Sequence, residues 1–209
     1  LDQQALSRTL FPLGQLHKSA VREIARRAGL PNHARRDSTG ICFIGERDFR
    51  DFLKRYLPSQ PGEIRTLEGQ HQGRHEGIMF YTLGQRHGLG IGGPGEAWYV
   101  VDKDVENNRL YVVQGEDHPA LYAPGLIAAG LHWVAGRAPA LPLCCAAKIR
   151  YRQSDQPGIV EGLDDNRVRM RFDVPQRAVT PGQSVVFYQD EICLGGGVIE
   201  THLTENGGA

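Results

Sequence analysis

The spacing of apolar residues in this 209-residue chain changes after Pro61-Gly62, and this change constrains the fold most strongly. Before that point the apolar residues recur every three or four positions, which is typical of amphipathic helices. After it they alternate with polar residues in short runs bounded by turn formers, which is typical of β-hairpins. The pattern predicts a helical N-terminal part followed by a mainly β remainder.

Two helices are predicted in the first part. One begins at a Ser19 cap and ends at Gly29, and its apolar face consists of Val21, Ile24, Ala25 and Ala28. The other spans residues 46–57, with apolar side chains at helical spacing and Pro58 at its end.

Three hairpins are predicted in the second part. They pair residues 98–102 with 109–113, residues 158–163 with 167–173, and residues 184–189 with a strand that starts at Ile192. Short strands at such close spacing predict a small barrel or sandwich. Several prolines follow His118, which places a domain boundary there.

Composition excludes some classes of protein. Lys+Arg and Asp+Glu both total 24, so an RNA partner would have to be held by a local patch of charge. The four cysteines are irregularly spaced, and the sequence shows neither an apolar leader nor an apolar run of membrane length. These features favour a soluble cytoplasmic protein without a disulfide scaffold.

Cys42 is the strongest functional candidate. It follows the polar loop Asp37-Ser38-Thr39-Gly40-Ile41 and precedes Phe43-Ile44-Gly45. Nearby arginines and the start of the predicted helix could stabilise a thiolate there. A free cysteine among apolar neighbours is, however, more often a small buried side chain.

Residues 148–152, Lys-Ile-Arg-Tyr-Arg, form the second candidate. Strand alternation would place three cations on one face, which suits a phosphate backbone or, equally, the solvated outside of a barrel. A tight turn at residues 180–184 should leave the amide of Gln183 exposed.

The glycine-rich residues 84–93 contain a G-x-G-x-x-G pattern, but Pro94 and a predicted strand follow where a nucleotide-binding helix should begin. A backbone turn or an RNA-contacting loop with Arg86 and His87 at its tip is favoured instead. His71, His75 and His87 match no zinc signature and are interpreted as surface residues, so no metal site is predicted.

A series of motifs in this order resembles the tRNA-specific 2-thiouridylase family over essentially the whole chain. They are Asp-Ser-Thr-Gly-Ile-Cys-Phe-Ile-Gly at 37–45, Phe-Arg-Asp-Phe-Leu at 49–53, Thr-Leu-Gly-Gln-Arg at 82–86 with Gly-Leu-Gly-Ile-Gly-Gly at 88–93, Trp-Tyr-Val-Val-Asp-Lys-Asp at 98–104, Arg-Tyr-Arg at 150–152, Ala-Val-Thr-Pro-Gly-Gln at 178–183, and Cys-Leu-Gly-Gly-Gly at 193–197.

The resemblance implies an α+β, mainly β fold in three parts. Residues 1–58 would be the helical end of an α/β adenylation domain with the cysteine loop, residues 59–117 a small central β-rich domain, and residues 118–209 an antiparallel six-stranded β-barrel.

The resemblance also implies an enzyme that makes 2-thiouridine at the wobble position (position 34) of the tRNAs for lysine, glutamate and glutamine. ATP, with Mg, would be bound by an N-terminal domain and would adenylate the C2 oxygen of the uridine. Sulfur from a relay protein would then reach C2 as a persulfide, which is a strong nucleophile near neutral pH.

Family positions map onto four residues of this chain. Cys42 would carry the persulfide and could form a disulfide with a second cysteine upstream, and Arg150, Tyr151 and Gln183 would contact tRNA. The sequence contains neither the family's ATP-binding loop nor the other cysteine, so we expect the C-terminal part of a longer, monomeric protein that is inactive alone and binds no cofactor itself. The alternative is a non-catalytic RNA-binding barrel module.

Overall fold

The computed structural model describes residues 1–35, 56, 59–151 and 153–204. The chain divides into two compact units, one over Gln3–Leu57 and one over Pro58–Ala209, and each is described by itself. The predicted helix at 46–57 and the loop around Cys42 lie outside the described residues, apart from Tyr56.

In its described residues, the first unit contains two helices, α1 (Gln3–Leu6) and α2 (Lys18–Arg27). The predicted cap at Ser19 is wrong, because the amide of Val21 already bonds the carbonyl of His17, so that Ser19 lies within the first turn. The predicted end is confirmed. Gly29 has a φ of 68°, and the amide of Leu30 bonds the carbonyl of Ala25, the pairing that closes many helices.

The second unit begins with a four-stranded sheet in the order β2-β1-β4-β3. Its strands are β1 (Gly62–Thr66), β2 (His71–His75), β3 (Trp98–Asp104) and β4 (Arg109–Gln114), and a short 3-10 helix, η1 (Ile78–Phe80), follows β2. β3 and β4 pair antiparallel, which confirms the first predicted hairpin. β1 and β4 pair parallel, a contact that the sequence does not signal.

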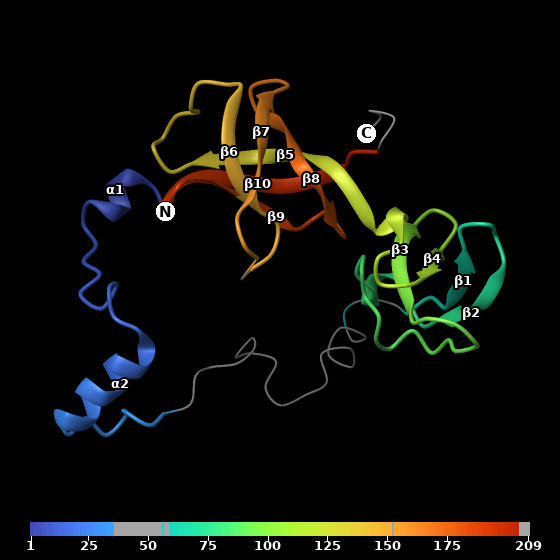
Figure 1. Ribbon diagram of the computed structural model, residues 1–209, viewed down its shortest axis with the longest axis horizontal. Coiled ribbons are helices and arrows are strands. Elements are labelled where there is room, and N and C mark those ends of the chain that lie inside the picture. The colour runs from blue at the N-terminus through green and yellow to red at the C-terminus, as the bar shows by residue number, and fades with distance from the viewer. Residues whose placement is uncertain (36–55, 57–58, 152, 205–209) are drawn as a thin grey trace. The chain divides into compact units, whose positions relative to one another are not determined.

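A closed barrel in the order β10-β5-β8-β7-β6-β9 follows another 3-10 helix, η2 (Pro119–Leu121). Its strands are β5 (Tyr122–Trp133), β6 (Leu143–Lys148), β7 (Gln156–Gly162), β8 (Arg167–Arg177), β9 (Ser184–Gln189) and β10 (Ile192–His202), as Figure 1 shows. Each neighbouring pair is antiparallel, and the two remaining predicted hairpins are confirmed. The fold is therefore α+β and mainly β, with a six-stranded antiparallel barrel.

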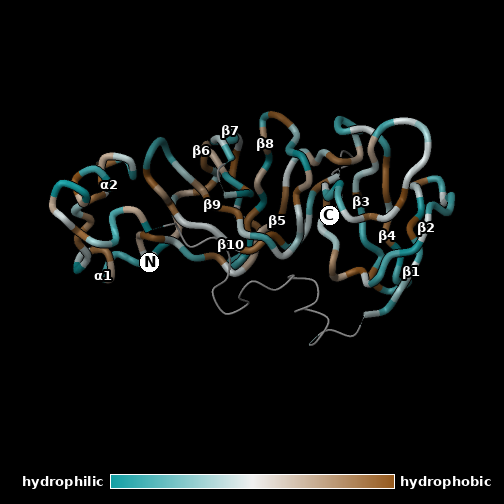
Figure 2. Tube along the Cα trace, turned by 90° about the horizontal axis from the view of Figure 1, so that it is seen from below, coloured by the Kyte–Doolittle hydropathy of each residue, from teal (hydrophilic) through white to brown (hydrophobic). Residues whose placement is uncertain are grey.

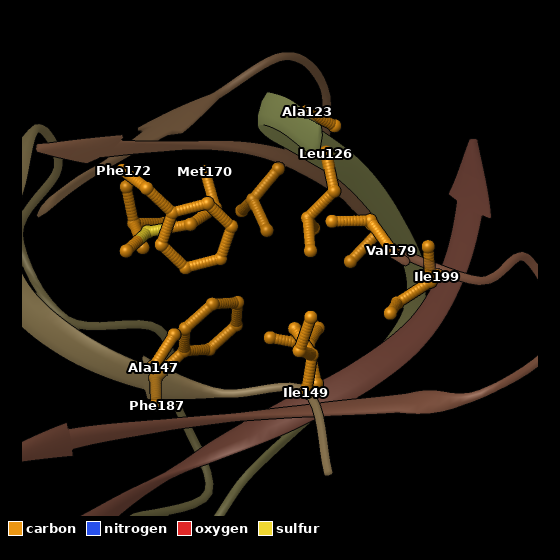
Figure 3. Packing of buried hydrophobic residues seen from close by; sticks show 13 residues of the cluster. Ala123, Leu126, Ala147, Ile149, Met170, Phe172, Val179, Phe187 and Ile199 are labelled. Carbon is orange, nitrogen blue, oxygen red and sulfur yellow. The ribbon is translucent and has the colours of Figure 1, made fainter. Parts of the chain in front are cut away.

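The interior of the barrel is filled by side chains from every strand (Figure 3). Strand β8 shows the rule: Val168, Met170 and Phe172 are buried, whereas the arginines between them point outward. Figure 2 shows apolar and polar residues interspersed along the strands accordingly. In the described residues no helix is long and apolar enough to cross a membrane.

The four-stranded sheet has its own core, and Ala178, which follows β8, belongs to it. The amide of Ala178 donates to the carbonyl of Leu121 at 2.7 Å. A Cβ placed on Gly84 would lie 2.8 Å from the Cβ of Ala178, so the two segments touch. The guanidinium of Arg177, the last residue of β8, lies 5.0 Å from the centre of the Tyr99 ring on β3. We call the contact formed by Gly84, Tyr99, Arg177 and Ala178 the junction between the sheet and the barrel.

Candidate functional site

An open groove of about 670 Å³ lies beside the end of β6 and the start of β9. Three of its lining residues are the predicted contacts Arg150, Tyr151 and Gln183, which the barrel brings together from two separate segments. The other lining residues are Lys148, Ile149, Gly182, Ser184, Val186 and Tyr188. We call this surface the basic groove.

The predicted strand through residues 148–152 is wrong, because β6 ends at Lys148. Beyond it, the amide of Ile149 bonds the side chain of Gln153 at 2.9 Å, and the amide of Gln153 bonds the carbonyl of Arg150 at 3.2 Å. These local bonds turn the chain away from the ladder, so Lys148 and Arg150 do not share one strand face. Arg152 lies outside the described residues.

Arg150 is held by the junction. Its Nη2 donates to the carbonyl oxygen of Ala178 at 3.1 Å. Burial lowers the pKa of Arg150, and the nearby charge of Arg177 lowers it further. One edge of the guanidinium is thus fixed to the backbone, and the remaining N–H groups can bind an anion.

The rest of the basic groove combines one further cation with two aromatic rings. Lys148 Nζ lies 3.2 Å from Asp155 Oδ1 and 4.9 Å from the centre of the Tyr188 ring. Tyr151 is 92% exposed, which presents a large ring to solvent. Cations beside exposed rings can bind phosphates and stacked bases together.

Gln183 is positioned by the predicted tight turn. Pro181 and Gly182, whose φ is 85°, occupy its centre, and the amide of Gln183 bonds the carbonyl of Thr180 at 3.3 Å. The Gln183 carbonyl also accepts from Ile199 at 2.7 Å, which ties the turn to β10. The side chain is half-exposed, less than expected.

The sequence interpretation missed Tyr188 as a groove residue. In β9 the side chains of Val185 and Phe187 are buried, so Tyr188 lies on the outer face with Val186, beside Lys148 of β6. Alternation along β9 predicts that Tyr188 points outward. Its position beside Lys148 follows only from the pairing of β6 with β9, which are distant in the sequence.

The glycine-rich residues 84–93 form a loop that leads into β3 rather than into a helix. The amide of Gly84 bonds the carbonyl of Val100 at 2.8 Å, and the side chain of Gln85 donates to the carbonyl of His87 at 2.8 Å. A nucleotide-binding turn of the strand-to-helix type is therefore absent from this described loop. Arg86 and His87 are exposed on it, as expected.

His71 and His87 are exposed, but the interpretation of His75 as a surface residue is wrong. Its side chain is 1% exposed, and Nε2 lies 3.2 Å from the carbonyl oxygen of Asn108. Within the described residues, no group of three or more His, Cys, Asp or Glu side chains is arranged to hold a metal ion.

Three cysteines are described, and none of them is disulfide-bonded. Cys144 and Cys193 are exposed, and Cys145 is half-buried. Burial, together with Cys144, raises the pKa of Cys145 to about 11, which disfavours its thiolate.

Three family models match consecutive parts of the chain. The tRNA methyl transferase HUP domain matches residues 1–46, the tRNA methyl transferase PRC-barrel domain matches residues 50–114, and the aminomethyltransferase beta-barrel domain matches residues 124–199. The last two ranges contain the four-stranded sheet and most of the closed barrel, respectively.

Curated relatives are similar over nearly the whole chain. The tRNA-specific 2-thiouridylase MnmA of Methylococcus capsulatus is 62% identical, with 96% of this chain and 56% of the relative covered. Those of Alkalilimnicola ehrlichii and Haemophilus influenzae are 60% and 57% identical, with 96% and 97% of this chain and 56% and 54% of the relatives covered. The chain thus spans about half the length of these relatives, and it belongs to the tRNA-specific 2-thiouridylase family.

Proposed function

We propose that this chain is part of an enzyme that replaces the C2 oxygen of the wobble uridine with sulfur in the tRNAs for lysine, glutamate and glutamine. The observation that carries the proposal is the basic groove, because it gathers Arg150, Tyr151 and Gln183 from two segments onto one surface. The names of the relatives support the same reaction.

In this proposal the described residues bind and orient RNA. Arg150 and Lys148 attract the phosphate backbone, Tyr151 offers a ring for stacking, and Gln183 supplies both a donor and an acceptor. A protein without net charge needs such a local patch, since its overall field does not attract RNA.

The chemical step is assigned to Cys42. The terminal sulfur of a Cys42 persulfide, delivered by a relay protein, would attack C2 after ATP-dependent adenylation, and AMP would leave with the former C2 oxygen. The thiolate of a second cysteine, outside this chain, could then attack the Cys42 sulfur and form a disulfide with it, which breaks the former persulfide bond and leaves the terminal sulfur on C2. ATP with Mg would be held by an N-terminal domain of the whole, monomeric, cytoplasmic protein, and this chain alone would be inactive.

The domain boundaries are proposed as residues 1–58, 59–117 and 118–209. The position of α1 and α2 before residue 58, the start of β1 at Gly62 and the start of β5 at Tyr122 support them.

Replacing Cys42 tests the catalytic assignment. We expect Cys42→Ser to abolish 2-thiouridine formation in a protein that joins this chain to the N-terminal part of the Methylococcus capsulatus relative, because a hydroxyl carries no persulfide. Nucleoside mass spectrometry of the tRNA measures the product. Cys193→Ser, which alters an exposed cysteine on β10, is the matched control. Wild-type thiolation by Cys42→Ser would instead favour the non-catalytic RNA-binding module.

A further inference from the structure

Two arginines meet at the junction between the sheet and the barrel. Arg177 Nη1 lies 3.5 Å, and Arg150 Nη2 3.9 Å, from the position that a Cβ on Gly84 would take. Because residue 84 is a glycine, no side chain of its own separates the two guanidinium groups. Arg150 belongs to the basic groove, whereas Arg177, at the end of β8, was not singled out by the sequence.

Arg177 is fixed in place without neutralisation of its charge. Its guanidinium lies 5.0 Å from the centre of the Tyr99 ring, and its Nε donates to the carbonyl oxygen of Glu116 at 3.2 Å. The carboxylate of Asp117, on the same segment as Glu116, accepts from the hydroxyl of Tyr122 at 3.1 Å. In the described part of the chain, no carboxylate forms an ion pair with Arg177 or Arg150.

The positive charges of Arg150 and Arg177 are therefore not neutralised, and an anion bound between them would be stabilised. Like charges at short range repel, and in the described part of the chain no ion pair offsets the repulsion between these two guanidinium groups. A phosphate between the groups would offset the repulsion and accept N–H donors from both forks, an arrangement in which arginine is favoured over lysine.

We propose that Arg150 and Arg177 together bind one phosphate of the RNA backbone at the junction. This inference rests on the proposed function and extends the basic groove onto the contact with the four-stranded sheet. Arg177 is then a binding residue, and its stacking on Tyr99 and its bond to Glu116 orient it for that phosphate.

The test measures the affinity of the chain for a tRNA transcript by fluorescence anisotropy over a range of salt concentrations. We expect Arg177→Gln and Arg150→Gln each to weaken binding about tenfold. In the double variant, the slope of the logarithm of the binding constant against the logarithm of the salt concentration should become shallower by about one released counterion. Because both side chains hold one phosphate, the double variant should bind scarcely more weakly than either single variant.

Two controls separate charge from structure. Arg167→Gln removes an arginine from the same strand where Asp164 pairs with it, and it should leave tRNA affinity unchanged. Tyr99→Leu removes the ring that orients Arg177 but no charge, so it should weaken tRNA binding less than Arg177→Gln does.

Wild-type affinity of Arg177→Gln, with weakened binding by Arg150→Gln, would overturn the shared phosphate and leave the proposed function intact. Fully additive losses in the double variant would also overturn it, since they indicate two separate contacts. Unchanged binding by both single variants would contradict the basic groove itself, and with it the RNA-binding part of the proposed function.

Discussion

At the scale of single residues, His75 shows how a polar strand can hide a buried group. The strand β2 reads His-Gln-Gly-Arg-His, so no apolar alternation marks an inward face. His75 is buried by residues outside its own strand. Its Nε2 lies near the carbonyl of Asn108, and its ring centre lies 5.8 Å from that of Tyr81. Its sequence position alone therefore predicts exposure, and only the packed sheet reveals the burial.

His75 should make stability depend on pH. Burial lowers its pKa, and the nearby charge of Arg74 adds to this, although the bond to Asn108 opposes it. The unfolded chain, with an ordinary pKa of about 6.5, therefore takes up a proton more readily than the folded chain. Stability present above about pH 6.5 should be lost as the pH falls through the lowered folded value.

Thermal or urea unfolding between pH 8 and pH 5 measures this loss. We expect His75→Gln to show a weaker decline in stability toward acid than the wild type, whereas His71→Gln, which alters an exposed histidine on the same strand, should decline like the wild type. Parallel declines for all three proteins would show that His75 does not carry the pH dependence.

At the scale of elements, local sequence signals predict the hairpins but do not predict the remaining strand pairings. Each predicted hairpin joins neighbouring segments across a short turn, so alternation and turn residues predict it. The parallel pairing of β1 with β4 and the closure of the barrel through β10 and β5 join distant segments. Strand β6 ends early because the amide of Ile149 donates to the side chain of Gln153, and the alternation of residues along the strand does not predict this bond.

Barrel closure leaves glycine positions that tolerate no side chain. A Cβ on Gly158 of β7 would run into the carbonyl oxygen of Arg171 on β8. Gly158→Ala should therefore lower the free energy of unfolding by about 1–3 kcal/mol, the usual cost of overpacking. Gly162→Ala, on the same strand with only an ordinary contact to Leu141, should cost much less. Equal melting temperatures for the two variants would contradict close packing of β7 against β8.

At the scale of the whole molecule, charge is arranged locally, because acidic and basic residues balance at 24 each. The outward arginines of β8 illustrate the arrangement: Arg167 pairs with Asp164 and Glu200, and Arg169 and Arg171 approach Glu161. Arg150 and Arg177 have no such carboxylate in the described residues. The sequence identified Arg150 through its motif, but the contrast between paired and unpaired arginines requires the folded barrel.

The junction should couple the four-stranded sheet to RNA binding. Gly84 touches Ala178, and the carbonyl of Ala178 holds Arg150, so a side chain at position 84 would push on the residue that orients a groove cation. Gly84 also has a φ of 77°, where alanine is strained. We expect Gly84→Ala to weaken tRNA binding several-fold, measured by anisotropy, although residue 84 does not line the basic groove.

The control for this coupling is Gly92→Ala in the same loop. Gly92 lacks a positive φ, and a Cβ there would meet nothing within 4 Å in the described structure, so stability and affinity should both stay as in the wild type. A Gly84→Ala protein that melts earlier yet binds tRNA with wild-type affinity would show that the sheet and the groove are independent. Loss of affinity at a temperature well below melting would instead show that the sheet helps to set the position of Arg150.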